Sequence, residues 1–522
     1  ILPWTREDYQ NKGKISFFSL ILLISGLCLV VGIWIVYGVH YDSIPDEAVT
    51  YRNWKHFSAP FIVEQTIAFA SRFRLLPEAF LLGLRDTLRK GTTETPTFFL
   101  GQVRTHGHPL YFTAAMFWKT PPAILLLSLA GLIALIKKRP GMPLLLFFAL
   151  PPLFWLIHFS LFTNFQLGLR YILPVYLFLF CLAGYGAAQL WHSFSGRIAA
   201  GILMVSLLIS SISAYPDYLA YFNSLTFGAR PLDLLSDSNL DWGQDLKSLA
   251  RLQAEGKLGQ EPVGLAYFGT ADPNYYHLQY RKLPVPLHYY SSGTKPVGLF
   301  EPGLPPMLAV SATCLQGLIY HSWGFHPYVF LHDEKSVDNA GGSIFIFKLS
   351  QNQQNSSLAE LCEAKYLEQL EQNPDNGQSL LGLGALYLRW PGRVSESTGV
   401  LEKALEILPN DPRSFYFCAL SHLQNDNPQE AAITLTRGLE RHPERPEFLY
   451  NLGIAYKRME EFNKALSAFE ETLRINPNHF EAHMAAGLIL AQRDKIEKAI
   501  HHFHRATEIR PDDLSAWETL GK

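Results

Sequence analysis

Apolar runs of membrane length crowd the first 215 residues of this 522-residue chain, and no other feature restricts its fold so strongly. A helix needs about 20 apolar residues to cross a hydrocarbon core about 30 Å thick. Five runs are of this kind, at residues 15–38, 116–136, 142–162, 170–191 and 197–215. Any single run could be a buried helix of a soluble domain, but five so close together predict a multi-span helical membrane domain over residues 1–215.

The basic residues beside these runs predict the orientation of the domain. Lys12 and Lys14 precede the first run, Lys137–Arg139 follow the second, and Arg197 lies at the turn between the last two. If every run crosses, all three places lie on one side, which the positive-inside preference makes the cytoplasm. We therefore expect a bacterial inner (cytoplasmic) membrane protein whose outer loop 39–115 and whose residues after 216 face the periplasm.

The outer loop is long for a connection and has its own helical pattern. Apolar residues recur at helical spacing within Phe61–Arg89, which fits helices lying in the membrane interface with guanidinium groups at headgroup level. A small globular insertion is the alternative. The arginines concerned are Arg72, Arg74, Arg85 and Arg89.

Composition excludes several classes of protein. The net charge of −2 argues against a nucleic-acid partner. The five cysteines are far apart and form neither a CxxC metal spacing nor a disulfide framework. They are Cys28, Cys181, Cys314, Cys362 and Cys418. We assign no metal ligands and no cofactor, and a divalent cation stays open. The chain begins with Ile1 and a polar segment without a signal-peptide pattern, so we expect a fragment that lacks its natural N-terminal part.

Residues 376–522 repeat with a period of 34 residues. Prolines recur at that step, as Pro409, Pro443, Pro477 and Pro511, each shortly after a predicted helix. Small residues, large residues and alanines align with them. The aligned positions are Gly384, Ala419, Gly453, Gly487; Tyr387, His422, Tyr456, Leu490; Ala431, Ala465, Ala499; and Leu435, Phe469, Phe503. This is the tetratricopeptide pattern of helix pairs, so we predict an α-solenoid with a concave face for a protein or peptide partner. A spacer or dimerisation arm is the alternative.

Between the membrane domain and the repeats, residues 216–350 predict a small α/β subdomain outside the cytoplasm, followed by a linker or helix at 351–375. Three short runs bounded by glycine or proline predict strands, at Val263–Phe268, Met307–Ser311 and Ser343–Lys348. Residues Asp241–Glu255 predict a helix. The predicted fold class is thus mainly α, with one α/β subdomain.

Cationic and polar side chains gather where the predicted topology places the outer membrane face. A charge beside hydrocarbon is costly and is retained where it has a partner or a task. The phosphate of a lipid-linked substrate would be such a partner, and phospholipid headgroups are the plainer one. The candidate phosphate ligands are Arg104, His106, His108, Lys119 and Arg170.

Several blocks resemble bacterial GT-C glycosyltransferases, the relatives of the protein O-mannosyltransferases and of the lipid A aminoarabinose transferase. Within about 99–350 they are Phe99–Gly107, Tyr111–Phe112, Phe117–Pro121, Leu167–Pro174, Asp217–Asn223, Asp237–Leu246 and Ala266–Pro273. The later blocks are similar to the subgroup that often carries C-terminal tetratricopeptide repeats. The resemblance implies a partial GT-C fold and the transfer of a sugar from a polyprenyl-phosphate donor to an envelope acceptor.

The resemblance also implies a catalytic base, an acidic residue in the first outer loop of a complete protein. A carboxylate there would deprotonate the acceptor hydroxyl while the phosphate leaves. No residue of this chain matches that loop, so no catalytic residue is assigned and we expect the fragment alone to be inactive.

The segment Asp237–Asp245 holds three carboxylates around a tryptophan, about twenty residues after the last apolar run. It can act as a structural clasp, with Asp241 capping the predicted helix and Asp237 and Asn239 forming the turn before it. Binding of donor or acceptor, or direct catalysis, are the alternatives. The residues concerned are Asp237, Asn239, Asp241, Trp242, Gln244 and Asp245.

Three functions remain open at this point. A polyprenyl-phosphate-dependent glycosyltransferase fits most of the blocks, and a membrane-anchored scaffold whose repeats do the binding is its main rival. A transporter fits less well, because its polar groups should lie near the midplane of the membrane and not at one face.

Overall fold

The computed structural model describes residues 24, 26–28, 30–38, 61–84, 95–138, 142–164, 166–286 and 298–521. The chain forms two compact units, Ile1–Glu94 and Thr95–Lys522. Several residues used above lie outside the described ones. They are Lys12, Lys14, Arg85, Arg89, Arg139 and residues 15–23, 25 and 29 of the first predicted span.

The first unit contains a short apolar helix at Gly26–Val36 and the helix α2, Phe61–Arg72. The indole Nε1 of Trp34 donates a hydrogen bond to the backbone oxygen of Leu75, 3.0 Å away. This bond ties the apolar helix to the turn that follows α2, inside the predicted outer loop.

Apolar helices open the second unit. Those long enough to cross a membrane are Leu144–Leu161, Leu169–Leu190 and Phe194–Ser213, and a bent pair of helices would raise the number among the described residues from three to four. The helices concerned are α4 (Tyr111–Lys119), α5 (Pro122–Lys137), α6 (Met142–Leu161), α7 (Leu173–Leu190) and α8 (Phe194–Ser213). Many of their large apolar side chains are exposed, such as Phe154 at 62% and Ile202 at 64%. Exposed apolar surface of this extent indicates association with a membrane.

The predicted span 116–136 differs from the structure, which breaks it into two helices. The axes of α4 and α5 meet at 110°, with Thr120 and Pro121 between them. Proline lacks an N–H group and clashes with the preceding turn, so a helix readily begins but rarely continues at Pro121–Pro122. The apolar run is continuous in sequence, but its helix is interrupted at Thr120–Pro121.

Small residues allow α5 and α7 to pack closely. A Cβ atom added to Gly131 would lie 1.9 Å from the backbone oxygen of Leu182, and one added to Gly186 would lie 2.1 Å from that of Leu127. The hydroxyl of Ser128 donates to the Leu179 backbone oxygen at 2.8 Å. Close contact of this kind is typical of helices that associate within a bilayer.

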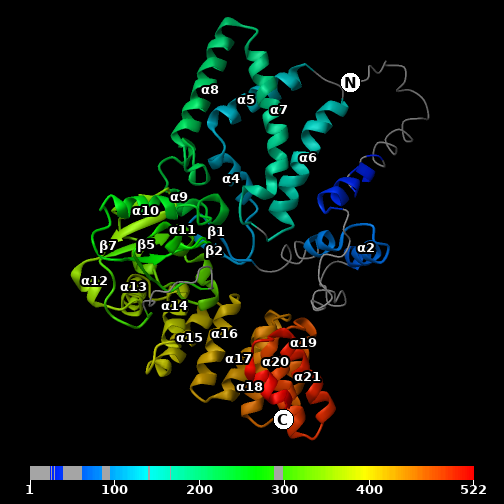
Figure 1. Ribbon diagram of the computed structural model, residues 1–522, viewed down its shortest axis with the longest axis vertical. Helices are drawn as coiled ribbons and strands as arrows, with labels where there is room; N and C mark the ends of the chain where they lie inside the picture. The colour runs from blue at the N-terminus through cyan, green and yellow to red at the C-terminus, as the bar shows by residue number, and fades with distance from the viewer. Residues whose placement is uncertain are drawn as a thin grey trace. The chain divides into compact units, whose positions relative to one another are not determined.

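A five-stranded sheet with strand order β4-β3-β5-β7-β6 follows the apolar helices. The strand β3 (Val263–Ala266) is parallel to β4 (Tyr280–Lys282) and β5 (Met307–Ser311), whereas β7 (Ile344–Lys348) is antiparallel to β5 and to β6 (Asp338–Ala340). The three predicted strand runs coincide with β3, β5 and β7. The flanking helices are α9 (Pro231–Leu234), α10 (Leu246–Ala254), α11 (Ala312–Leu315), α12 (Gln351–Asn355) and α13 (Leu358–Gln372), several of which are labelled beside the sheet in Figure 1.

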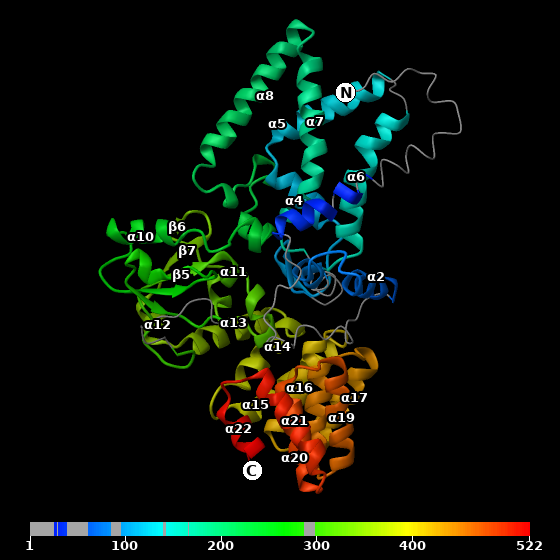
Figure 2. The same cartoon turned by 45° about the vertical axis from the view of Figure 1, so that its right-hand side comes forward.

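Helix pairs make up the C-terminal part, and they follow one another in Figures 1 and 2. They are α14 (Gly377–Tyr387) with α15 (Val394–Ile407), α16 (Pro412–Gln424) with α17 (Pro428–Arg441), α18 (Pro446–Arg458) with α19 (Phe462–Ile475), and α20 (Phe480–Gln492) with α21 (Ile496–Ile509), followed by α22 (Leu514–Gly521). The aligned glycines lie where the two helices of a pair cross. A Cβ atom at Gly453 would lie 2.5 Å from Phe469 Cε1, and one at Gly487 would lie 2.5 Å from Phe503 Cε1. The periodic pattern thus reflects a packing requirement.

Candidate functional site

The segment Asp237–Asp245 connects the apolar helices to the sheet. It starts with a short 3₁₀ turn, η6 (Asp237–Asn239), and its Asn239 side chain is buried. The side-chain Nδ2 of Asn239 donates to the Tyr111 hydroxyl at 2.8 Å, and its Oδ1 accepts from the Leu169 backbone N–H at 3.2 Å. Asn239 therefore joins the segment to α4 and to the start of the apolar stretch Leu169–Leu190.

Asp241 has a different role from the predicted helix cap. The helix α10 begins only at Leu246, because Gly243 has a φ of +77° that interrupts any helix from residue 241. The fully buried Asp241 carboxylate instead accepts from the backbone N–H of Gly243 at 3.1 Å and of Thr313 at 3.0 Å. Because Thr313 is the second residue of α11, Asp241 satisfies a free N–H group at the start of that helix.

Asp245 connects the same segment to the residue that precedes β7. Its Oδ2 accepts from the Ser343 hydroxyl at 2.7 Å and from the Ser343 backbone N–H at 3.2 Å, just before β7. The neighbouring Gln244 Nε2 donates to the same Asp245 oxygen at 3.2 Å and to the Leu240 backbone oxygen at 3.1 Å. The two bonds between Asp245 and Ser343 join residues that are 98 positions apart in the chain.

The three carboxylates share an unusual electrostatic environment. Burial raises the pKa of Asp237, Asp241 and Asp245 to about 6 each. None of the three forms an ion pair within the described part of the chain; the nearby Arg170 guanidinium only partly offsets the effect of burial at Asp237. Hydrogen bonds from backbone N–H groups and hydroxyls take the place of cations around them.

The side chains of Arg170 and Trp242 are exposed and lie next to each other beside this segment. The guanidinium carbon of Arg170 lies 5.1 Å from the ring centroid of Trp242 and 5.1 Å from that of Tyr171. Trp242 is 51% exposed, and its inner edge meets the Phe268 ring at a centroid distance of 5.9 Å. An exposed indole beside an exposed guanidinium can hold a sugar ring and an anionic group together.

Lys119 is engaged within the fold and does not present a free charge. Its Nζ donates to the backbone oxygens of Leu219 and Asn239, both at 2.6 Å, and lies 4.4 Å from the ring centroid of Phe222. Nearby, the Asn223 Nδ2 donates to the backbone oxygens of Phe117 at 2.7 Å and Thr120 at 2.6 Å. These contacts satisfy the backbone at the bend between α4 and α5.

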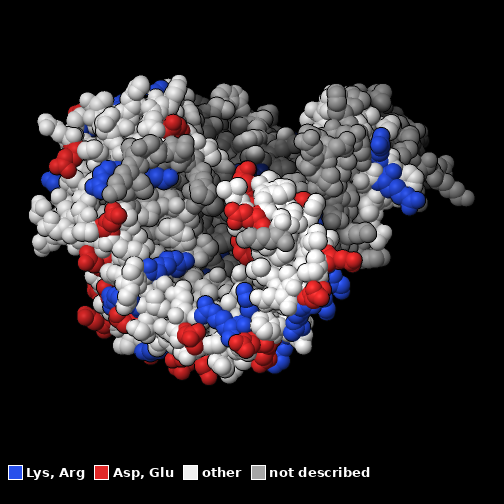
Figure 3. Space-filling model, turned by 60° about the horizontal axis from the view of Figure 1, so that its bottom comes forward, with Lys and Arg blue, Asp and Glu red and all other residues white. Residues whose placement is uncertain are grey.

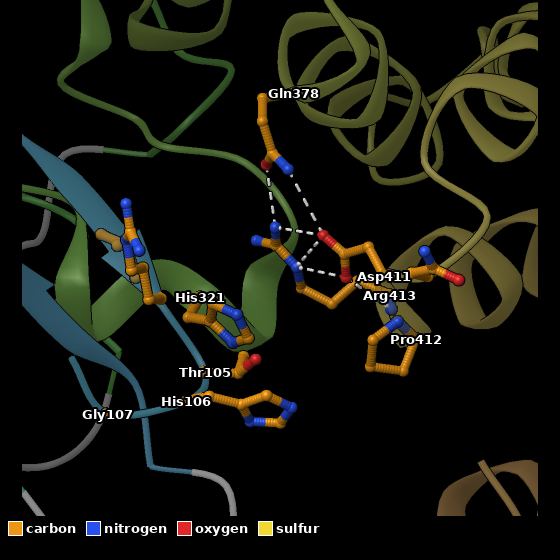
Figure 4. A pocket seen from close by; sticks show the side chains of 11 residues that line it. Thr105, His106, Gly107, His321, Gln378, Asp411, Pro412 and Arg413 are labelled. Atoms are coloured by element: carbon orange, nitrogen blue, oxygen red, sulfur yellow. Dashed lines mark hydrogen bonds and ion pairs between the residues drawn. The ribbon is translucent and has the colours of Figure 1, made fainter. Parts of the chain in front are cut away.

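The remaining candidate phosphate ligands lie elsewhere. The His108 backbone exchanges two hydrogen bonds with the Gln166 side chain, at 2.6 Å and 2.9 Å, and its ring lies 4.7 Å from that of Phe99. Arg104 and His106 line a separate pocket formed with the repeats (Figure 4). The structure therefore distributes the five predicted ligands over three places, and only Arg170 lies with its charge exposed beside the Asp237–Asp245 segment.

Sequence reasoning missed the groups that complete this site. Tyr111 accepts a hydrogen bond from Asn239, whereas Thr313 and Ser343 donate to Asp241 and Asp245. No local sequence pattern connects these pairs. The histidine, cysteine and acidic side chains among the described residues include no group of three or more that could hold a metal ion.

Comparison with known proteins identifies the C-terminal part. Two tetratricopeptide repeat models match, one at residues 446–479 and one at residues 419–458. The predicted C-terminal repeats are confirmed as tetratricopeptide repeats. No curated protein matches the chain.

Three solved structures that are similar to the chain each cover less than a third of it. A crystal structure of MamA is 25% identical, covers 29% of this chain and 89% of that chain, and has a TM-score of 0.28. The crystal structure of YrrB, a TPR protein with an unusual peptide-binding site, is 24% identical and has a TM-score of 0.29. It covers 31% of this chain and 84% of that chain. MamA 41-end from Desulfovibrio magneticus RS-1 is 22% identical and has a TM-score of 0.28. It covers 30% of this chain and 88% of that chain.

Proposed function

We propose that this protein is an inner-membrane glycosyltransferase that moves a sugar from a polyprenyl-phosphate donor to an envelope acceptor on the outer face, with its repeats recruiting an acceptor or partner protein. The observation that carries the proposal is the pairing of exposed Arg170 with exposed Trp242 at the start of an apolar helix of membrane length. The resemblance of residues 99–350 to GT-C glycosyltransferases supports it.

The chemistry of the two side chains suits a lipid-linked sugar. A guanidinium forms charge-assisted, bidentate hydrogen bonds with phosphate oxygens, and an indole ring packs against the C–H face of a sugar. Both groups lie beside the apolar helix, where a polyprenyl chain would remain in the membrane. Arg170 would thus bind the donor phosphate while Trp242 orients the sugar.

The reaction that the resemblance implies is a single displacement. The acceptor hydroxyl oxygen forms a bond to the anomeric carbon, the bond to the phosphate oxygen breaks, and the polyprenyl phosphate leaves with the electron pair. A carboxylate takes the hydroxyl proton. Asp241 and Asp245 do not suit that role, because their oxygens already accept hydrogen bonds that hold the fold together.

A transfer assay tests the proposal. Membranes carrying the protein as its organism makes it are incubated with radiolabelled polyprenyl-phosphate sugar, and label in envelope fractions is measured. We expect Arg170→Gln to lower kcat/KM by about 10- to 100-fold, the effect of losing a charge-assisted hydrogen bond in the transition state. The matched control is Arg230→Gln, which removes an exposed arginine whose ion pair with Asp233 lies outside the site. If no radiolabelled sugar is transferred to any envelope fraction, the proposed glycosyltransferase activity is refuted.

A membrane-anchored scaffold without catalytic activity is the second candidate, and the tetratricopeptide repeats favour it. Their concave faces commonly bind proteins or peptides. This candidate predicts that partners are captured through the repeats equally well by the wild type and by Arg170→Gln, and that no sugar is transferred by either.

A further inference from the structure

A polar pocket of about 390 Å³ lies where the first repeats meet the preceding part of the same unit. The segment Val103–Gly107 forms one wall; it starts within β2 (Gln102–Arg104), which pairs with β1 (Thr97–Phe99). His321 in the 3₁₀ helix η8 (Leu318–Trp323) forms another wall. The first helices of two repeats supply Gln378 and Arg413. Figure 4 shows these side chains around one opening.

The pocket carries an excess of hydrogen-bond donors and of positive charge. Arg413 uses Nη2 and Nε for Asp411, at 2.6 Å and 3.1 Å, and Nη2 also reaches Gln378 at 2.8 Å. Its Nη1 has no partner among the described residues. Arg104 Nη2 donates a hydrogen bond to Gln102 Oε1 at 2.7 Å, and Arg104 forms no ion pair among the described residues. The lining holds two arginines and one carboxylate, so it carries one more positive than negative charge.

His321 adds a neutral polar group to the same pocket. Burial, and secondarily the positive charge of Arg413, lower the pKa of His321 to about 4. The imidazole is therefore uncharged near pH 7 and can donate one hydrogen bond without adding charge.

The wall beside His321 is held firmly against the repeats. The residue Phe325 belongs to the same buried core as the first helices α14 and α16. A Cβ atom at Gly324 would lie 2.4 Å from Phe417 and 2.7 Å from Ala385, and the Arg389 guanidinium lies 5.4 Å from the Phe325 ring centroid. The chain's own Gly324–Phe325 segment thus covers part of the face that the first helices of these repeats share. The pocket lies at the edge of this contact.

We infer that this pocket binds a carboxylate of an acidic polypeptide segment that lies along the first helices of the repeats. A polypeptide is favoured over a lipid headgroup because Gln378 and Arg413 lie on the first helices of two repeats, α14 and α16, and repeat solenoids offer extended surfaces that bind polypeptides. Elsewhere, on the face shown in Figure 3, acidic and basic side chains are interspersed, so a broad basic surface does not explain such binding. The inference specifies the partner class of the recruiting role proposed above for the repeats.

Fluorescence anisotropy of the purified full chain in detergent tests this inference with a labelled hexaglutamate peptide. Hexaglutamine of the same length measures binding that is independent of charge. We expect hexaglutamate to bind at low salt, hexaglutamine to bind at least about tenfold more weakly, and Arg413→Gln to reduce hexaglutamate affinity about tenfold. The control Arg437→Gln removes an exposed arginine from α17 of the same repeat and should change affinity less than about twofold.

A second variant keeps the test decisive if Arg413→Gln does not fold. Arg104→Gln leaves the repeats untouched and should weaken hexaglutamate binding about fivefold. Absence of hexaglutamate binding, or equal losses in Arg437→Gln, would overturn the inference. So would binding of phosphatidylglycerol vesicles that depends on Arg104 and Arg413 while hexaglutamate does not bind. The sugar-transfer assay is separate, so failure of either proposal is recognised without the other.

Discussion

At the scale of single residues, Asp237 offers a direct test of the electrostatics of the candidate site. Its folded-state pKa of about 6 lies above the ordinary value of 3.8, so the protonated form is favoured. The stability that the group contributes is therefore complete below about pH 4 and is lost as pH rises to about 6. Replacing it with asparagine removes the cost of a buried charge and suits the left-handed backbone at residue 237, where φ is +54°.

We expect Asp237→Asn to be more stable than the wild type at pH 8, by on the order of 2 kcal/mol, and to lose that advantage near pH 4. Thermal unfolding of the full chain in detergent, followed by tryptophan fluorescence at both pH values, measures this. Asp494→Asn is the control, since Asp494 has a φ of +58° and is exposed. A gain for Asp237→Asn that is equal at both pH values would contradict burial as the cause.

The residues of the candidate site were only partly predictable. Asp237, Asn239, Asp241 and Asp245 stand close together in sequence, so their role as a connecting segment could be inferred from a local pattern. Their partners could not, because Thr313 and Ser343 follow Asp241 and Asp245 by 72 and 98 residues. Such bonds depend on how the sheet closes.

At the scale of elements, the close crossing of the two helices in each repeat explains why the periodic small and large residues predicted the repeats. Gly453 faces Phe469 at the third crossing, whereas the second repeat has Ala419 and Leu435 at the same positions. We expect Gly453→Ala to destabilise the protein by about 1–3 kcal/mol through overpacking. The double variant Gly453→Ala, Phe469→Leu should recover part of that loss, because it recreates the pair found in the second repeat.

Thermal unfolding of the single and double variants measures this coupling. Gly399→Ala is the matched control, since nothing lies within 4 Å of a Cβ atom there and alanine favours a helix more than glycine does. It should stabilise the protein slightly. A Gly453→Ala variant as stable as the wild type would show that the crossing can relax.

Elements that a repeated pattern or flanking glycine and proline residues delimit were predicted well. Elements that one or two residues interrupt within a continuous pattern were not. The strands lie within the short runs bounded by glycine or proline, and the repeat helices follow the 34-residue spacing. The bend at Thr120–Pro121 and the late start of α10 were not predicted, because an apolar or helical pattern continues across each position while one proline pair or Gly243 interrupts the backbone.

At the scale of the whole molecule, the direction in which the chain crosses the membrane is the remaining test. The five-span topology, with a cytoplasmic start, places Lys522 in the periplasm and Lys138 in the cytoplasm. Alkaline phosphatase is active only after export, so a fusion after Lys522 should be active and a fusion after Lys138 should be inactive. β-Galactosidase fusions at the same sites should show the opposite pattern. The pair of sites matters because basic residues, which resist export, lie beside Lys138 and not beside Lys522. An inactive phosphatase at Lys522 would mean an even number of crossings, and the tetratricopeptide repeats would then meet their partner in the cytoplasm.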